Sequence, residues 1–247
     1  MQLRAGADDD AVLADQFEQF VRDQSFPCVG AKSALARGNL KMMVANSLLS
    51  GWDDLRIHDA LLEWAWDYTK DLEQVEAPEF RSLAVIFRDT DPMSEESFEE
   101  ALWQRIQSLS DKDAWRGQGH DTSVSADPDD PHFSLSFGGQ AFFVVGLHPH
   151  ASRPARRFHH PVLVFNLHDQ FELLRERGKY ETMRDTILKR DIALAGDVNP
   201  MLSRHGETSE ARQYSGRIVD EDWRCPFQDP RSSSRQNGDA SAGAASK

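Results

Sequence analysis

The sequence has few cysteines, a shortage of basic residues and no long apolar run. Its 247 residues contain only two cysteines, Cys28 and Cys225, which are too few for a disulfide framework and form no C-x-x-C metal pair. Lys and Arg number 28 against 41 Asp and Glu, and this net charge of −13 disfavours nucleic acid and anionic lipid as partners. No stretch reaches the roughly 20 apolar residues of a membrane span, and the N-terminal segment lacks an apolar signal core. We therefore expect a cytoplasmic protein that binds neither nucleic acid nor membrane.

Hydrophobic periodicity in the first half of the chain predicts helices around one strand. Apolar residues recur at helical spacing over 11–23, and Pro27 follows where a helix would have to stop. A longer amphipathic helix is predicted over 52–74, and the short apolar run 82–87 is typical of a buried strand. Ser94 is a suitable N-cap for the next helix.

The second half predicts a long loop, three strands and a helix. The polar stretch 108–131 has no periodicity and is expected to be a loop. Two strands joined by the Gly138–Gly139 turn should follow as a hairpin, and 161–168 is predicted to be a further strand. A helix is expected over 169–191, with four apolar residues facing inward: Phe171, Leu174, Met183 and Ile187.

Together these elements predict one α+β domain over 1–230. Its small central sheet, mixed or antiparallel, should be flanked by helices, because strands cluster in the middle of the chain between helical segments. The final segment, 231–247, is too polar and too rich in small residues to bury area, and we expect it to be disordered.

Positive charge gathers in one segment of this acidic chain. The stretch 148–158, "HPHASRPARRF", follows an apolar run and contains three arginines: Arg153, Arg156 and Arg157. Guanidinium groups suit carboxylates or phosphates, but the cluster could equally be a solvated loop paired with surplus acids. His148 and His168 each end a predicted strand, where each is either a metal ligand or an ordinary hydrogen-bonded histidine. A histidine followed by three arginines would suit haem iron and its propionates.

A second dense polar stretch, 190–217, is longer than a turn requires. It is either an ordinary long loop or part of a pocket wall, to which six of its residues could contribute: Asn199, His205, Glu207, Glu210, Tyr214 and Arg217. Cys28 and Cys225 are each more typical of a small buried apolar residue than of a thiolate ligand to haem.

The order of five motifs, "FPCVGAK", "LHPHASRPARRF", "VFNLHDQFELLR", "NPMLSRHGETSEARQYSGR" and "WRCPF", resembles the YqcI/YcgG family over roughly residues 26 to 227. That family includes haem-dependent N-hydroxylases of guanidine and amine nitrogens, such as arginine. The resemblance implies haem b, dioxygen, an external electron donor and a small guanidine or amine substrate. A haem-binding sensor or carrier without turnover is the alternative, and a haem-free module in which the arginines hold a free carboxylate or phosphate is a further one. The oligomeric state stays open, with a homodimer as one candidate.

The resemblance also implies roles for residues within the matching motifs. His148 or His168 would hold the iron. The cofactor would be bound by Ser152, Arg153, Arg156, Arg157, Asn166 and His205. The substrate would be handled by Glu210, Tyr214 and Asn199. Separately from the resemblance, a cationic substrate needs carboxylate partners, and Glu207 and Glu210 in the late stretch are the candidates.

Overall fold

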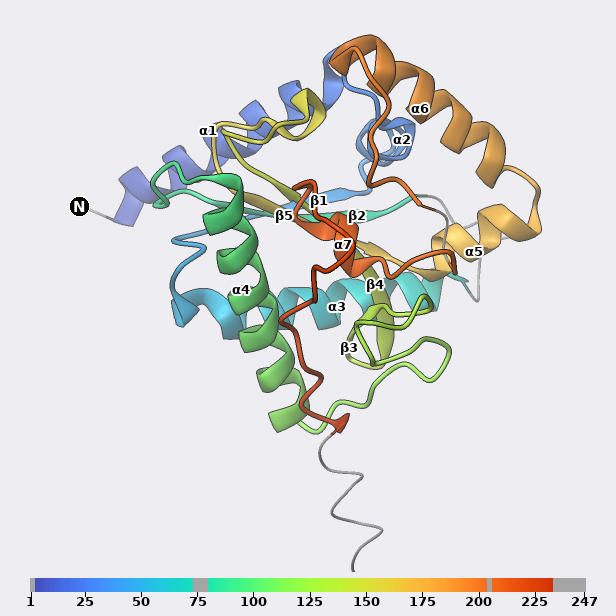
Figure 1. The fold of residues 1–247 in the computed structure, drawn as a ribbon. Coiled ribbons are helices and arrows are strands. Elements are labelled where there is room, and N and C mark those ends of the chain that lie inside the picture. The colour runs from blue at the N-terminus through green and yellow to red at the C-terminus, as the bar shows by residue number, and fades with distance from the viewer. Residues whose placement is uncertain (1–2, 73–79, 204–205, 233–247) are drawn as a thin grey trace, which may run out of the picture.

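The computed structural model describes residues 3–72, 80–203 and 206–232, which form seven α-helices and a five-stranded sheet. The order of strands in the sheet is β1-β2-β5-β4-β3 (Figure 1). The strands are β1 (Leu40–Ala45), β2 (Ser82–Phe87), β3 (Leu135–Phe137), β4 (Gln140–Leu147) and β5 (Val162–Leu167). β1 and β2 are parallel, and the other neighbours are antiparallel. The predicted α+β fold with a mixed sheet is confirmed.

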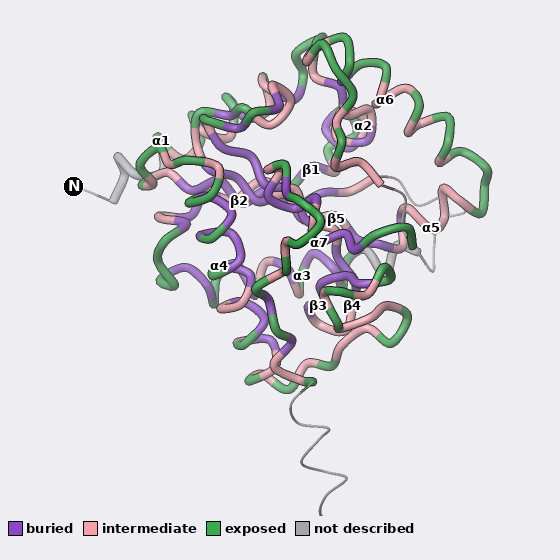
Figure 2. The backbone as a smooth tube through the Cα atoms, in the orientation of Figure 1, coloured by how far each residue is buried: buried purple, intermediate pink, exposed green. Residues whose placement is uncertain are grey.

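Helices cover both faces of the sheet (Figure 1). They are α1 (Leu3–Arg22), α2 (Val29–Ala36), α3 (Asp54–Leu72), α4 (Glu95–Trp115), α5 (Asp169–Glu176), α6 (Tyr180–Ala195) and the short α7 (Ala211–Tyr214). The main core lies between the sheet and α3 and α4, whereas a smaller apolar cluster lies between the other face and α1 and α2. The strands are buried, while α5 and α6 are largely half-buried or exposed (Figure 2). Within the described residues, none of the helices has the length and apolar character to cross a membrane.

Local signals placed several elements correctly. β2 has the predicted bounds, and the Ser94 hydroxyl caps α4 by accepting from the Ser97 backbone N–H at 3.2 Å. Gly138 and Gly139 have φ values of 60° and 75°, the left-handed conformation that a tight hairpin turn requires and that glycine adopts without strain.

Three boundaries differ from the sequence expectations. α4 continues to Trp115, so the expected loop over 108–131 begins later. Polar residues of this last part of α4 are paired with α3 instead of being solvated: Asp113 accepts from His58 at 2.6 Å, and Ser108 and Lys112 donate to Asp54. The first helix begins earlier than predicted, at Leu3.

The expected helix over 169–191 is two helices. It is broken at Gly178, whose φ of 64° ends α5 before α6 begins. The helix α2 and the edge strand β1 were not predicted. Most of the tail expected to be disordered, from residue 233 onward, lies outside the described residues.

Candidate functional site

A cavity of about 270 Å³ lies between the sheet and helices α2 and α6. We call it the inner cavity. Strand alternation builds its floor, because Phe143 and Val145 of β4 and Val164 of β5 point toward it while their sequence neighbours point into the main core. Further apolar walls come from Phe17, Phe26, Leu40, Phe80, Phe171, Met183 and Ile187. The polar side chains that line it include Cys28, Arg153, Arg156, Asn166, Asp191, Asn199 and Gln213.

A smaller chamber of about 190 Å³ adjoins this cavity, and we call it the outer chamber. The two share six lining residues and therefore adjoin, and we call them together the hollow: Phe143, Phe171, Met183, Ile187, Leu202 and Gln213. Polar residues found only in the outer chamber are His168, Arg175, Tyr180, Arg184, Ser203 and Glu210. The apolar faces predicted for α5 and α6 therefore line a hollow rather than fill a core.

Arg156 lines the inner cavity and forms no ion pair with an acidic side chain that the structure describes, although the charge of Asp191 acts on it from a distance. Its guanidinium donates to the carbonyls of Gly146, Tyr214 and Gln213 at 3.2, 3.0 and 2.8 Å, and among the described residues none of its hydrogen bonds goes to a carboxylate. Burial lowers the pKa of Arg156 to about 10, which leaves it charged at neutral pH. Gly216 closes over it, because a Cβ there would lie 2.5 Å from the Arg156 Cδ. The arginine is thus held rigidly at the cavity wall.

Arg153 lines the same cavity but its charge is neutralised. It donates to Asp191 at 2.5 Å and to Asp197, and its side chain is only 7% exposed. Burial acts to lower the pKa of Arg153, but the hydrogen bonds to the two carboxylates outweigh it and raise the pKa. Of its guanidinium nitrogens, Nε is buried without a partner in the part of the chain that the structure describes.

Two other residues of the basic motif lie away from the cavity. Arg157 is exposed and donates to the carbonyls of Ala151 and Ser152. Ser152 is also exposed, and its backbone N–H donates to Glu95. The short 3-10 turn Pro154–Arg156 separates the directions of the three arginines, so Arg153 and Arg156 point inward and Arg157 points outward.

The two strand-end histidines do not meet. β4 and β5 are antiparallel, and the His168 backbone N–H donates to Ala141 at the start of β4, whereas His148 follows the end of β4. The seven residue-to-residue steps from 141 to 148 span roughly 23 Å at the rise of a β-strand. One iron therefore cannot be ligated by both.

His148 faces the main core rather than the cavity. Its ring stacks on Phe98 of α4 with centroids 4.3 Å apart, and it is 1% exposed. Burial lowers its pKa to about 4, so the ring is neutral at neutral pH. Its Nδ1 has no hydrogen-bond partner within the described ranges.

His168 lines the outer chamber beside two acids. Its Nε2 lies 3.7 Å from Glu210 Oε1 and 3.8 Å from Glu172 Oε1. Glu210 is buried and accepts from the Ser134 hydroxyl at 2.8 Å. The structure thus brings a histidine and a carboxylate together at one end of the hollow.

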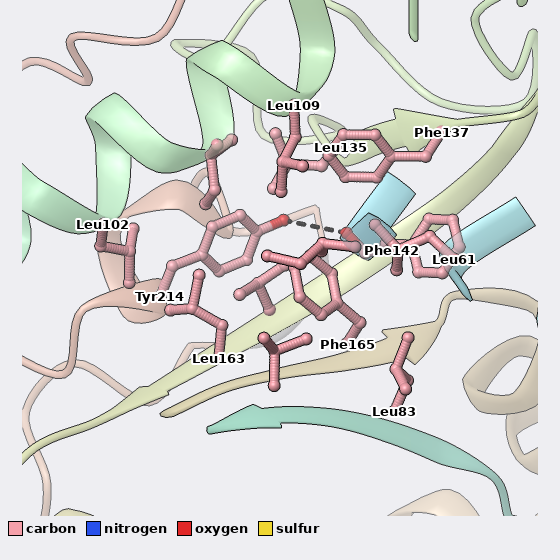
Figure 3. Packing of buried hydrophobic residues seen from close by; sticks show 14 of the residues in the cluster. Leu61, Leu83, Leu102, Leu109, Leu135, Phe137, Phe142, Leu163, Phe165 and Tyr214 are labelled. Atoms are coloured by element: carbon pink, nitrogen blue, oxygen red, sulfur yellow. Dashed lines mark hydrogen bonds between the residues drawn. The ribbon is translucent and has the colours of Figure 1, made fainter. Parts of the chain in front are cut away.

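The remaining candidates are divided between the hollow and other places. Asn199 and Asn166 line the inner cavity, and Asn166 accepts from the Ser82 hydroxyl at 2.7 Å. Tyr214 lies in the main core with its hydroxyl 3.3 Å from the Phe142 carbonyl (Figure 3) and 3.5 Å from Glu210, and burial raises its pKa well above its usual value. Glu207 is exposed and lines a separate surface cleft. His205 lies outside the described residues.

Sequence reasoning missed Asp191 and Arg184 as lining residues. They are two of several charged residues on α6, so only tertiary packing distinguishes them from the surface charges of that helix. No group of three or more His, Cys, Asp or Glu side chains arranged to hold a metal ion occurs in the described part of the chain. Haem iron needs only one axial protein ligand.

Comparison with known proteins gives one finding about ancestry. No curated protein and no solved structure gives a significant match. The family model of the YqcI/YcgG family matches residues 17–228, which cover both the inner cavity and the outer chamber. The chain therefore belongs to the YqcI/YcgG family.

Proposed function

We propose that this protein is a haem-dependent N-hydroxylase that acts on the nitrogen of a small guanidine or amine, with dioxygen and electrons from an external donor. The observation that carries the proposal is the apolar hollow with Arg156 at its wall and His168 with Glu210 at its other end. Aromatic and aliphatic walls suit a flat macrocycle, and a half-buried cation at the wall suits the acidic groups of haem.

Arg156 is the first candidate for a haem propionate. Its charge has no carboxylate partner in the described chain, whereas Arg153 already contacts Asp191 and Asp197. A propionate at Arg156 would form a charge-assisted pair in a buried place, where such pairs are strong. A second propionate at Arg153 would have to compete with Asp197. Arg157 has no part in this proposal.

Iron ligation is assigned to His168. Four side chains of the hollow are of types that ligate haem iron: His168, Cys28, Met183 and Tyr180. Imidazole is the commonest protein metal ligand, which favours His168. Burial raises the pKa of Cys28 and so favours the protonated thiol, which is a poorer ligand than neutral imidazole. His148 is not proposed, because its ring lies in the core against Phe98.

When bound, haem would supply the activation of dioxygen that oxygen insertion into an N–H bond requires. The residues of the chain would bind and orient the substrate. Glu210 is buried beside His168, and its carboxylate can accept hydrogen bonds from a guanidinium or ammonium group. Apolar side chains such as Phe143 and Phe171 exclude water from the reacting nitrogen. The Ser134 hydroxyl holds Glu210 in place at 2.8 Å.

The experiment is reconstitution with haemin followed by two readouts. Visible spectra of the ferric, ferrous and CO-bound forms report haem binding, and mass spectrometry with oxygen and a reductant reports a one-oxygen gain on arginine or related amines. Arg156→Gln should lower haemin affinity by about tenfold or more, because it removes a charge-assisted pair worth roughly 1.5–3 kcal/mol. Arg157→Gln is the matched control and should have no effect.

Four results would count against parts of this proposal. A protein that shows no Soret band with haemin would refute haem binding. Equal haemin affinity of Arg156→Gln and Arg157→Gln would mean that Arg156 does not bind a propionate. Haem binding without any oxygenated product across a panel of guanidines and amines would favour the sensor or carrier. The haemin-reconstituted His168→Ala variant should not show the ferric and ferrous spectra of the wild type. Unchanged spectra would mean that another residue, with Cys28 the next candidate, ligates the iron.

A further inference from the structure

The outer chamber contains two arginines whose surroundings differ. Arg175 forms an ion pair with Glu172 and lies over the Tyr180 ring at 4.5 Å from its centroid. Arg184, on α6, lines the same chamber and is half-buried, yet it makes no hydrogen bond or ion pair with any residue that the structure describes. Arg175 is therefore already neutralised, whereas Arg184 is not.

The lack of an ion pair between Arg184 and any described acidic side chain matters because this chain has acids in excess, 41 against 28 basic residues. A half-buried guanidinium loses part of its hydration, and an ion pair would compensate for that loss. Guanidinium also presents a planar set of donors that matches a carboxylate bidentately. A ligand carboxylate would provide the partner that no described residue of the chain provides.

Glu210 gives the chamber a second, opposite charge. Its side chain is 7% exposed and lies beside His168. A ligand with a cationic group at Glu210 and a carboxylate at Arg184 would match both. The outer chamber, at about 190 Å³, is smaller than the inner cavity of about 270 Å³, so the ligand placed between Arg184 and Glu210 is small.

We propose that Arg184 binds the carboxylate of the substrate, so that the outer chamber selects a cationic amino acid over the amine formed by its decarboxylation. The identity of this ligand as substrate rests on the proposed function, but its binding does not require turnover. Arg184 is then a specificity-determining residue. Glu210 contributes to the binding of both molecules, whereas Arg184 contributes only to that of the amino acid.

Isothermal titration calorimetry with two matched pairs tests this inference. The probes are L-arginine with agmatine, and L-lysine with cadaverine, each titrated into haem-loaded and haem-free protein. At least one amino acid should bind the wild type more tightly than its partner amine. Arg184→Gln should weaken that amino acid about tenfold or more and leave its amine unchanged, because one charged hydrogen-bonding pair is lost. Glu210→Gln should weaken both members of the pair.

Controls keep the result interpretable. Arg190→Gln changes an exposed arginine of the same helix that lines neither chamber, and it should bind like the wild type. Arg184→Lys keeps the charge without the planar fork and should retain part of the affinity for the amino acid. This variant keeps the test decisive if Arg184→Gln folds poorly. Circular dichroism compares the folding of all variants.

The inference is overturned if neither amino acid binds more tightly than its partner amine, or if Arg184→Gln weakens both members equally or neither. Failure of the proposed function gives a different pattern. In that case Arg184→Gln still removes the preference for the amino acid, while the haem spectrum or the oxygenated product is missing.

Discussion

Arg153 offers an internal comparison of two ion pairs that share one guanidinium. Its partners differ in exposure, because the side chain of Asp191 is 8% exposed and that of Asp197 is 74% exposed. Removing a partner from a buried charge typically costs about 3–5 kcal/mol, whereas an exposed pair contributes about 1 kcal/mol or less. Since Asp197 would remain beside Arg153, we expect Asp191→Asn to lower the free energy of unfolding by about 3 kcal/mol, at the lower end of that range. Asp197→Asn should lower it by about 1 kcal/mol or less.

Urea unfolding of the haem-free protein followed by circular dichroism measures both losses. For a chain of this length about 3 kcal/mol corresponds to a fall of roughly 6–12 °C in Tm. Asp185→Asn, an exposed change on the same helix, should leave the unfolding free energy unchanged. Equal losses for Asp191→Asn and Asp197→Asn, or a larger loss for the exposed partner, would refute the reasoning from burial.

Two further predictions concern the face of the sheet away from the cavity. Because burial lowers the pKa of His148 to about 4, the unfolded chain binds more protons below pH 6.5, so stability should fall by up to about 3 kcal/mol between pH 6.5 and pH 4. His148→Phe should remove that part of the pH dependence in acid titrations of the unfolding free energy, and an unchanged profile would contradict it. Gly146→Ala should destabilise the fold by about 1–3 kcal/mol in thermal unfolding, because its Cβ would lie 2.8 Å from both Leu102 and Phe98. An unchanged Tm would contradict this prediction and would mean that the α4 side chains move aside without cost.

The fold was most predictable where its signals are local. Paired glycines specify the β3–β4 hairpin, and a serine N-cap specifies the start of α4. β1 was missed because its sequence, with Lys41 and two methionines, has a weak strand pattern and its only partner is the parallel strand β2. The end of α4 was missed because its polar residues are paired with α3, so a buried helix has the composition of a loop.

The site was predictable as a set of motifs but not as an arrangement. His148 and His168 both end strands, and sequence alone could not show that those strands run in opposite directions. Arg156 and Arg157 are neighbours, yet the short turn sends one toward the cavity and the other to solvent. Residue type therefore identified the candidates, and strand direction and side-chain direction divided them.

His148 and His168 are far apart because the motifs that contain them follow antiparallel strands. The basic motif after β4 and the histidine motif after β5 lie at opposite ends of antiparallel strands, so they can serve one ligand only if that ligand extends along the sheet. The two chambers of the hollow adjoin between these ends, because Gln213 lines both while its carbonyl accepts from Arg156. An elongated molecule with acidic groups at Arg156 would leave its far end beside His168 and Glu210. Under the proposed function the motifs would contribute to one site through the two adjoining chambers, although His148 and His168 lie far apart.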